Sequence, residues 1–479
     1  MQPTFIARKE EQLILKEALN SPEAEMVAVI GRWRVGKTYL VTSVYDNQIA
    51  FSVTGIQNGA LEDQLGRFSK SMKKYSGAKI DLPIPKNWFE AFDLLQQYIE
   101  TLAENRKHVI FIDELPWLAP HKSKFLQAFG HFWNDWASRQ NLVVVICGSA
   151  ASWMIQKVVN NTGGLYNRIT KRIFLQPFTL SETEEYLKTK HLKFTRYQIV
   201  QVYMALGGIP HYLKEVKKGK SAVQNINDIC FSKNGLLRGE FLRLYPSLFP
   251  NAEKHFKVIR ALAEKREGLS RQEIIKYAKL TDGGGLTTVL DELSHSGFIT
   301  PYRIFHQKKR KVYRLTDEYS LFYLKFIEDN SDSYRNEGDD IWQHLSQTNE
   351  YKTWSGYAFE NICLKHIPQI KKALQISGIY SLSSTFYKKG TANEKGLQID
   401  LLIDRKDHVI NLFEIKFHNK AFTITKAYAD NLRKKMWRFE EITKTKKQIS
   451  WVFISAFGLN ENEYSLDIVG KSLTLDSLF

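Results

Sequence analysis

The stretch MVAVIGRWRVGKT, residues 26–38, decides the fold of this chain. Its apolar first part, 26–30, leads directly into a glycine-rich loop, 31–36, and a helical pattern follows. Strand, glycine loop and helix are the natural interpretation of this order. The loop fits GxxxxGK(S/T), in which backbone N–H groups hold phosphates, the lysine reaches the β and γ phosphates, and the hydroxyl binds Mg²⁺. The stretch therefore predicts a site for ATP and Mg²⁺. The residues expected to bind them are Gly31, Arg32, Trp33, Arg34, Val35, Gly36, Lys37, Thr38 and Tyr39, with Thr38 also holding the metal.

A second motif follows an apolar run at 109–112, where Asp113 and Glu114 come in succession. This is the form of an acidic strand end whose first carboxylate, Asp113, holds Mg²⁺, usually through water. The second carboxylate, Glu114, can orient the attacking water, which favours ATP hydrolysis over ATP binding alone. A chance glycine loop beside an ordinary acidic strand end is the alternative, and the agreement of spacing and context disfavours it.

The next apolar run ends at Ser149, which could contact both the γ-phosphate and the water or could instead cap the following helix. Arg168 and Arg172 precede and open a further strand pattern. From there a guanidinium could reach phosphate within the chain or across a subunit contact, and a surface ion pair is the alternative for each arginine.

Apolar runs alternate with helical patterns over the first part of the chain, which predicts a parallel sheet. The expected strands cover 26–30, 49–53, 108–112, 142–148 and 172–176, and one of the helical patterns covers 124–139. The expected fold class is α/β, with a P-loop NTPase parallel-sheet core over residues 1–178. A helical lid is expected over residues 179–245, where the pattern becomes helical throughout.

Composition limits the class of protein. At roughly 150 residues per domain, 479 residues predict about three domains. An apolar share of 43% excludes a disordered chain, and no apolar run is long enough to span a bilayer. A charged N-terminus gives no sign of export, so we expect a cytoplasmic protein with no membrane partner.

The cysteines, Cys147, Cys230 and Cys363, have no metal or disulfide spacing and are expected to be buried. A net charge of +17 favours a polyanionic partner, although a solvated basic surface is the alternative.

Residues 246–327 have the order of a winged helix, with helix patterns followed by strands at 299–305 and 311–316. The basic segment HQKKRK between those strands is the best signal for DNA, which is favoured over RNA as a partner. Against it, the third helix carries no arginine or lysine, so a structural or interaction module is the alternative. The residues assigned to groove and phosphate contacts are Thr287, Thr288, His295, Lys308, Lys309, Arg310 and Lys311.

A polar stretch at 328–345 is the expected linker, and 346–479 the expected last domain. That domain carries Asp400 on one apolar strand and Glu414 with Lys416 on the next. The D…ExK arrangement is that of PD-(D/E)XK nucleases, in which the carboxylates bind Mg²⁺ or Mn²⁺ and the lysine assists the attacking water. A second metal is therefore expected here, and a non-catalytic binding module is the alternative. Glu360 on an upstream helix suits support of the metal. A basic helix downstream suits a phosphate-facing surface, with Lys426, Arg433, Lys434, Lys435 and Arg438.

Over essentially its whole length the chain resembles the P-loop ATPases common in archaea and some bacteria, which belong with AAA+ and STAND nucleotide switches. The resemblance is carried by GRWRVGKT, FIDELPWL, CGSAASWM and the stretch GGIPHYL at 207–213. It implies that Phe5, Ile6 and Arg8 lie near the adenine and that Pro210 closes over the base from the lid. It also implies a C-terminal domain similar to the nucleases above. Without the resemblance, 207–210 indicates only a helix end and a new helix start.

The leading hypothesis is an Mg²⁺-dependent ATPase switch coupled to a nuclease-like domain that acts on nucleic acid. A signalling or assembly protein, in which ATP controls oligomerisation and the last domain only binds a partner, is the main alternative. A DNA-translocating motor ranks last because no further helicase motif is visible. A homo-oligomer is compatible with either of the first two hypotheses.

Overall fold

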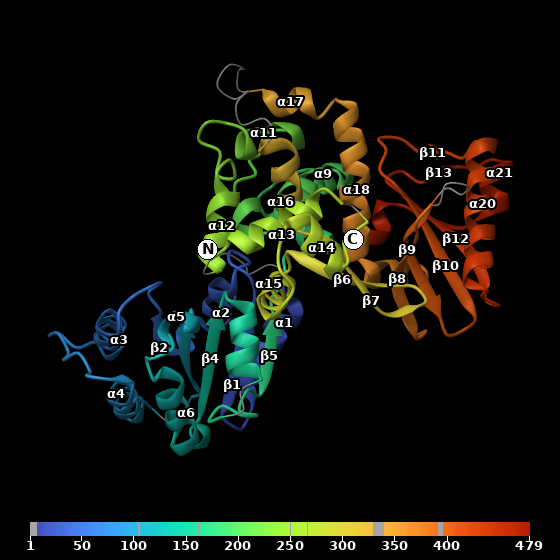
Figure 1. The fold of residues 1–479 in the computed structure, drawn as a ribbon. Helices are drawn as coiled ribbons and strands as arrows, with labels where there is room; N and C mark the ends of the chain where they lie inside the picture. The colour runs from blue at the N-terminus through green and yellow to red at the C-terminus, as the bar shows by residue number, and fades with distance from the viewer. Residues whose placement is uncertain are drawn as a thin grey trace. The chain divides into compact units, whose positions relative to one another are not determined.

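The computed structural model shown in Figure 1 describes residues 7–103, 106–160, 163–249, 251–265, 267–328, 340–390 and 396–479. The side chains of 307–310 lie outside the description, as do Phe5 and Ile6. The chain divides into two compact units, Met1–Pro177 and Phe178–Phe479. The second unit contains the segments expected to form the lid, the winged helix and the last domain.

A five-stranded sheet forms the centre of the first unit, in the order β2-β3-β4-β1-β5. Every neighbouring pair in it is parallel, as the alternation of strands and helices predicted. Its strands are β1 (Glu25–Ile30), β2 (Ile49–Thr54), β3 (His108–Asp113), β4 (Leu142–Gly148) and β5 (Lys171–Phe174). Because the strands are parallel, the loops after β1, β3 and β4 all leave from the same edge of the sheet.

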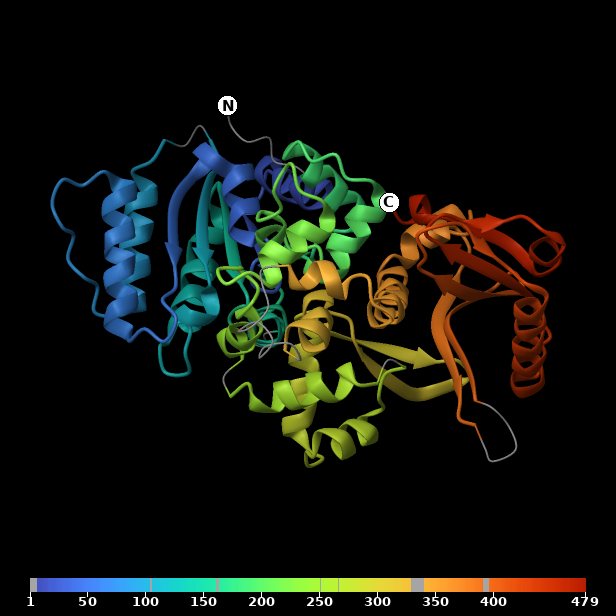
Figure 2. The same ribbon diagram turned by 90° about the horizontal axis from the view of Figure 1, so that it is seen from above.

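Helices and turns connect these strands, and Figure 2 shows α3 and α4 side by side next to β2. The helices are α1 (Lys9–Asn20), α2 (Lys37–Tyr45), α3 (Leu61–Ser76), α4 (Trp88–Glu100), α5 (Leu115–Leu118), α6 (Phe125–Asp135) and α7 (Ala151–Met154). The apolar pattern at 124–139 therefore forms α6 as predicted. Trp88 is fully buried where α4 meets α6, its ring edge-on to Phe125 at 4.7 Å between centroids.

The second unit is built on a mixed seven-stranded sheet in the order β14-β12-β10-β9-β8-β6-β7. Its strands are β6 (Ile299–Ile304), β7 (Gln307–Leu315), β8 (Ser381–Lys388), β9 (Leu397–Arg405), β10 (Val409–Lys416), β12 (Gln448–Ser455) and β14 (Val469–Leu473), and β11 (Phe422–Thr423) pairs separately with β13 (Leu459–Asn460). Within it β9 and β10 are antiparallel, and β10 runs parallel to β12.

The helices of the second unit fall into a group that precedes β6 in the chain and a group that follows β7. The first group is α8 (Leu180–Thr189), α9 (Arg196–Leu206), α10 (Pro210–Leu213), α11 (Ala222–Cys230), α12 (Glu240–Leu248), α13 (Glu253–Ala263), α14 (Arg271–Ala278) and α15 (Gly284–His295). The second group is α16 (Glu318–Phe322), α17 (Ile341–Leu345), α18 (Asn349–Lys365), α19 (Ile367–Ala373), α20 (Lys426–Thr443) and α21 (Glu463–Ile468).

The two strands expected to form a wing are present, but their turn lies elsewhere than predicted. The strand β6 ends at Ile304 and β7 begins at Gln307, with His306 in the left-handed region at a φ of 59°. The basic run 308–311 is therefore part of β7 and not a connecting loop. The strand β6 also pairs with β8 through Ile304 and Thr385, so both strands extend the C-terminal sheet (Figure 1). The sequence pattern of β6 and β7 could not predict the pairing of β6 with β8, because β8 lies far away in the sequence.

The expected linker is wrong at its C-terminal end, because 341–345 form the helix α17. Trp342 is 1% exposed and packs against the rings of Phe231 and Phe322, whose centroids are 5.5 and 4.8 Å away. Because the segment before residue 341 is polar, the sequence did not indicate the helix α17 or its buried tryptophan. Residues 329–339 lie outside the described part of the chain.

The prediction that the cysteines are buried is confirmed. Cys147, Cys230 and Cys363 are free thiols, and all are buried. In the described segments, no helix has the length and apolar character needed to cross a bilayer.

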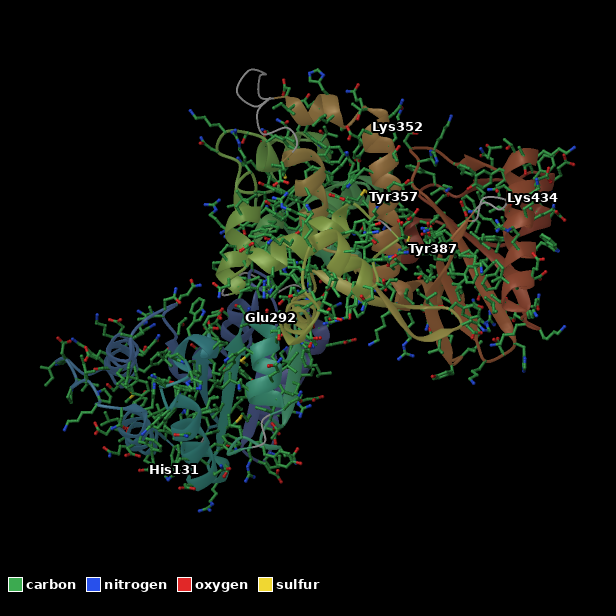
Figure 3. All side chains as sticks on the ribbon, in the orientation of Figure 1. His131, Glu292, Lys352, Tyr357, Tyr387 and Lys434 are labelled. Carbon is green, nitrogen blue, oxygen red and sulfur yellow. The ribbon has the colours of Figure 1, made fainter. Side chains whose placement is uncertain are left out.

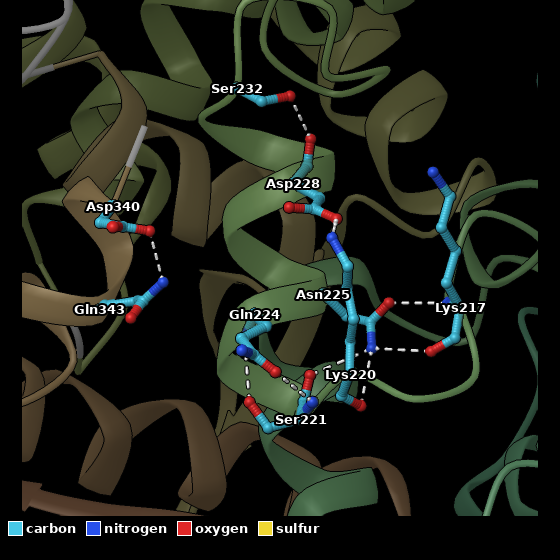
Figure 4. Close-up of polar contacts among 9 residues, drawn as sticks. All are labelled: Lys217, Lys220, Ser221, Gln224, Asn225, Asp228, Ser232, Asp340 and Gln343. Atoms are coloured by element: carbon cyan, nitrogen blue, oxygen red, sulfur yellow. Dashed lines mark hydrogen bonds and ion pairs between the residues drawn. The ribbon is translucent and has the colours of Figure 1, made fainter. Parts of the chain in front are cut away.

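A network of side-chain caps fixes the start of α11, which Figure 4 shows in close-up. Asn225 is 1% exposed, and its amide carbonyl accepts a hydrogen bond from Lys217 N at 2.7 Å. Its amide nitrogen donates to Lys217 O at 3.1 Å and to Lys220 O at 3.2 Å. The loop before α11 therefore depends on one buried side chain for its backbone partners.

Asn225→Ala is expected to lower the free energy of unfolding by about 1–3 kcal/mol, because it removes the hydrogen bonds that the buried Asn225 amide makes to the backbone of Lys217 and Lys220. Chemical denaturation followed by circular dichroism measures the change. Asn431→Ala, at an exposed position on α20, is the matched control. Equal stability of the two variants would contradict the capping role of Asn225.

Candidate active sites

The glycine loop after β1 is held in one backbone path by its neighbours. A Cβ atom at Gly31 would lie 2.4 Å from Leu175 O, at the end of β5, so only glycine fits there. Gly36 has a φ of 93°, a left-handed conformation that favours glycine, and it stands directly before α2. Val35 is buried and anchors the loop between these two glycines. The motif thus forms a compact turn that leads into the N-terminus of a helix.

Lys37 is the centre of this loop. Its side chain is buried, and Nζ donates to Gly31 O at 2.9 Å, to Arg32 O at 3.1 Å and to Ser149 Oγ at 2.9 Å. Burial lowers the pKa of Lys37, against the opposing effect of the Glu114 and Asp113 carboxyl groups. The ammonium group therefore connects the loop after β1 to the end of β4.

Thr38 and Asp113, both expected to hold Mg²⁺, lie in contact. Thr38 Oγ1 donates to Asp113 Oδ2 at 2.8 Å, which brings together a hydroxyl from α2 and a carboxylate from the end of β3. Burial raises the pKa of Asp113, while the hydrogen bond from Thr38 lowers it. Hydroxyl and carboxylate oxygens are ligands that suit Mg²⁺, so this pair fits a site for that ion.

Glu114 and Ser149 form a buried pair beside Lys37. Ser149 N donates to Glu114 Oε2 at 3.1 Å, and the Ser149 hydroxyl donates to Glu114 Oε1. Glu114 has a φ of 48°, so its backbone is in the left-handed region where the strand ends. The N-cap of α7 is Ala150 and has no side-chain hydrogen bond, so the alternative that Ser149 caps this helix is wrong. Ser149 instead bridges Glu114 to Lys37.

The other residues of the nucleotide-binding motif lie around this centre. Arg32 is buried, whereas Tyr39 on α2 is 51% exposed. The Arg34 guanidinium lies 5.3 Å from the centre of the Trp33 ring. Arg8 is buried at the start of α1 and donates to Gln176 O, just beyond β5. Because Gln176 follows the carboxyl end of β5, Arg8 lies at the edge of the sheet that carries the glycine loop.

Arg168 and Arg172 do not share that edge. Arg168 is exposed in the loop before β5, and Thr170 N pairs with Met26 O near the start of β1. Arg168 thus lies at the amino end of the sheet, opposite the glycine loop. Arg172 is also exposed, and it pairs with Ala28 in the middle of β1. These positions do not favour a phosphate contact within the same chain, and a contact across a subunit boundary stays a prediction.

The stretch around Pro210 ends one helix and begins another. The helix α9 ends at Leu206 and α10 begins at Pro210. A Cβ atom at Gly208 would lie 1.9 Å from Phe178 O, and Gly208 O accepts from Phe178 N at 2.6 Å. The turn is therefore fixed by close backbone contact within the second unit. The approach of Pro210, Phe5 and Ile6 to the base stays a prediction.

In the second unit, Glu414 is buried among cationic and hydroxyl groups. Glu414 Oε1 lies 2.9 Å from Lys416 Nζ, Oε2 lies 3.0 Å from Lys435 Nζ, and Tyr428 Oη donates to Oε1. Burial alone would raise the pKa of Glu414, but the Lys416 and Lys435 ammonium groups hold it at about 2. Glu414 and Lys416 project together from β10, as their two-residue spacing predicted.

Tyr428 and Lys435 reach Glu414 from α20, and the sequence analysis missed this role for both. They stand seven residues apart, which places them on one face of a helix and is the signal that could have identified them. Lys435 had been assigned to a phosphate-facing surface, as had Arg433. Arg433 instead pairs with Asp430 and Asp467, at 2.7 and 2.6 Å.

Asp400 has other partners than Glu414. Gln398 donates to Asp400 Oδ1 at 2.7 Å, and Arg314 Nη2 lies 3.8 Å from the same oxygen. Glu360 on α18 lies close enough to both carboxylates to be affected by their charge. Burial raises the pKa of Glu360 to about 8. The negative charges of Asp400 and Glu414 contribute to this rise in pKa, whereas the positive charges of Arg314 and Lys416 oppose it. No group of three or more His, Cys, Asp or Glu side chains in the described segments is arranged to hold a metal ion.

The residues expected to touch nucleic acid on α15 are exposed. Thr287 and Thr288 donate to carbonyls of their own helix start, Gly283 O at 3.4 Å and Gly284 O at 3.1 Å. His295 is exposed at the end of the same helix. Lys311 on β7 is also exposed, while the side chains of Lys308, Lys309 and Arg310 lie outside the description. Their contact with DNA stays a prediction.

Comparison with known proteins agrees with the geometry of the first unit. Residues 5–216 match the sequence family described as an ATPase domain predominantly from Archaea. Residues 323–431 match a family described as archaeal and bacterial proteins of unknown function. Residues 5–216 are thus similar to an ATPase domain, which agrees with the motifs in the sequence. The match extends beyond Pro177 and includes α8, α9 and α10 of the second unit.

Relatives extend over most of the chain. An uncharacterized protein of Methanocaldococcus jannaschii is 26% identical over 443 residues, which are 90% of this chain and 91% of that protein. The Walker-type ATPase of Pyrococcus abyssi has a similar fold, with a TM-score of 0.51 and 16% identity over 67% of this chain and 96% of that chain. The ORC2 protein of Aeropyrum pernix gives a TM-score of 0.42 at 14% identity, over 72% of this chain and 96% of that chain. The fold is α/β with the parallel-sheet core of P-loop ATPases, and the mixed C-terminal sheet is an addition to it.

The raised pKa of Glu360 predicts a pH dependence of stability. Between about pH 4.3, the ordinary glutamate pKa, and pH 8 the folded chain keeps a proton that the unfolded chain has lost. Stability contributed by Glu360 therefore falls as the pH rises through this window. Glu360→Gln cannot ionise, so it should be more stable than the wild type at pH 8 by about 1–3 kcal/mol, with a smaller difference at pH 5.

Chemical denaturation of both proteins at pH 5 and pH 8 measures this difference. Glu350→Gln, at an exposed position of the same helix, is the control for loss of a carboxylate. A Glu360→Gln difference that does not change with pH would contradict the raised pKa.

Proposed function

We propose that this chain is an Mg²⁺-dependent ATP-hydrolysing switch whose nucleotide state acts on a nuclease-like C-terminal segment. The observation that carries the first part is the connected group of Lys37, Ser149 and Glu114, next to the contact of Thr38 with Asp113. These side chains come from the ends of β1, β3 and β4, where a parallel sheet presents its loops together.

Each side chain has a distinct role in the proposed hydrolysis. Lys37 and the backbone of the glycine loop bind the phosphates, and Thr38 with Asp113 holds the metal. Bound Mg²⁺ neutralises the charge that develops on the phosphates. Glu114 orients the attacking water, and Ser149 positions Glu114 relative to Lys37. Because Ser149 bonds to both groups, it is the element that can convey a change at the γ-phosphate to the carboxylate.

Glu114→Gln is expected to bind ATP normally and to lose ATP hydrolysis by about 100-fold or more, because the amide cannot orient water as the carboxylate does. Lys37→Ala is expected to lose ATP binding itself, because it removes the phosphate-contacting ammonium group. Phosphate release and binding of a fluorescent ATP analogue separate the two effects. Glu62→Gln, at an exposed position on α3, is the matched control. Hydrolysis by Glu114→Gln at the wild-type rate would refute the role of this carboxylate.

The C-terminal part of the proposal rests on Asp400, Glu414 and Lys416. They stand on the neighbouring strands β9 and β10, and Glu360 lies close enough to Asp400 and Glu414 to be affected by their charge. Carboxylates and a lysine are the residue types that a metal-dependent nuclease uses, although the described carboxylates are not arranged as a group of three that holds a metal ion. A net charge of +17 supports nucleic acid as the partner, with DNA favoured over RNA.

A second candidate function is a signalling or assembly protein whose C-terminal segment binds a partner without catalysis. The observation that favours it is the saturation of Glu414, since both carboxylate oxygens already contact groups of Lys416, Lys435 and Tyr428. A carboxylate so engaged can serve as a structural anchor. The two candidates share the ATPase part and differ only in what the C-terminal segment does.

Coupling between the two parts is supported by the helix α9. Its residues fall inside the matched ATPase domain, and the Gly207–Pro210 turn directly follows it. Near its start, the Tyr197 ring is stacked on Phe417 with centroids 4.9 Å apart and 3° between the planes. Phe417 follows Lys416 in the chain. A shift of α9 driven by the nucleotide would therefore reach the end of β10 through one aromatic contact.

Tyr197→Ala is expected to abolish an ATP-dependent change in hydrogen exchange at residues 412–417, because it removes the ring that contacts Phe417. Tyr197→Phe keeps the ring and should retain the change. Exchange measured with and without ATP, in the wild type and both variants, gives the comparison independently of nuclease activity. An ATP effect of equal size in Tyr197→Ala would show that the nucleotide does not act on β10 through α9.

A further inference from the structure

A cavity of about 630 Å³ lies in the second unit beside the proposed nuclease site. Its walls come from α13, β7, the segment 321–328 and α18. Arg314 and Glu360, which both lie near Asp400, form part of the lining. The cavity is therefore continuous with the group of charged residues that includes Asp400, and it belongs to the size range that holds small ligands.

Two ion pairs involve half of the eight charged side chains that line the cavity. Arg260 pairs with Glu328 through both of its terminal nitrogens, and Lys325 pairs with Glu350. Arg314 differs, because it lies at the end that approaches Asp400 and its contact with that carboxylate is long, at 3.8 Å. It is thus the lining cation best placed to accept an anionic group between the cavity and Asp400.

Arg314 is held in position by several neighbours. The side chain is 5% exposed, and Nε donates to Glu267 O at 3.3 Å. The guanidinium also lies 5.6 Å from the centre of the Tyr302 ring. A guanidinium fixed in this way keeps a planar set of donors in one orientation, which suits bidentate recognition of phosphate. Arg314 stands on β7, so it reaches this place only because β6 and β7 extend the C-terminal sheet.

We propose that the cavity binds an unpaired nucleic-acid strand and that Arg314 contacts the phosphate that lies next to Asp400. This inference deepens the proposed nuclease function by naming its substrate class, and it rests on that function for the role of Asp400. A cavity of this volume suits a short stretch of a flexible single strand better than a rigid duplex. Trp354 and Tyr357 of α18 line the cavity and offer aromatic rings to a base, and Figure 3 labels Tyr357.

Binding of a fluorescent single-stranded DNA oligonucleotide to the full chain tests the inference. The assay uses fluorescence anisotropy in EDTA, where a metal-dependent nuclease cannot cleave. Arg314→Lys is expected to weaken binding about tenfold, because lysine loses the bidentate contact. Tyr357→Ala is expected to weaken it several-fold through loss of stacking. A duplex of the same sequence should bind more weakly than the single strand.

Arg405→Lys is the matched control, since this arginine stands on β9 of the same sheet, pairs with Asp407 and does not line the cavity. Thermal unfolding checks that Arg314→Lys remains folded, and the half-buried Tyr357 provides a second, less disruptive variant. Binding by Arg314→Lys and Tyr357→Ala equal to that of Arg405→Lys would overturn the inference, as would a preference for duplex DNA.

Failure of this inference and failure of the nuclease proposal give different results. Arg314-dependent binding without cleavage in Mg²⁺ or Mn²⁺ would support the strand-binding site and contradict the proposed nuclease activity. Cleavage with no effect of Arg314→Lys or Tyr357→Ala on binding or KM would support the nuclease proposal and contradict the strand-binding site.

Discussion

The buried ammonium group of Lys37 is the interaction on which the first unit depends. It joins the glycine loop to Ser149, and Ser149 in turn holds Glu114. A buried lysine is costly unless its donors are satisfied, and here carbonyls and a hydroxyl satisfy them. The loop, the end of β3 and the end of β4 are therefore fixed relative to one another by one charge. A phosphate group that contacts Lys37 would act on all three at once.

In the second unit, charged residues from distant parts of the chain come together because they stand on strands of one wide sheet. Because β6 and β7 continue past β8, Arg314 from the middle of the chain lies beside Asp400 from β9. Glu414 is held by Lys416 on its own strand and by two residues of α20. Chain segments far apart in sequence thus meet around Glu360. The same sheet also receives α9 through the stack of Tyr197 on Phe417.

Local patterns were sufficient to predict the first unit, because its function lies in short motifs at strand ends. The five strands, Thr38 beside Asp113, and Ser149 near the glycine loop followed from apolar runs and spacing. The positions of Arg168 and Arg172 could not be predicted, since they depend on where the loop before β5 leaves the sheet. In the second unit, the hairpin turn at His306 and the helix α17 were placed incorrectly. Arg314 was missed because only the pairing of β6 with β8 brings it to Asp400.

The central claim is that one chain couples ATP to a metal-dependent nuclease-like site. Its most direct test is cleavage of supercoiled and linear DNA by the purified protein with Mg²⁺ or Mn²⁺, with and without ATP. The account predicts cleavage that Asp400→Ala abolishes and that responds to ATP in the wild type but not in Lys37→Ala. Intact ATP hydrolysis with no cleavage under any of these conditions would contradict it and would favour a switch whose C-terminal segment only binds a partner.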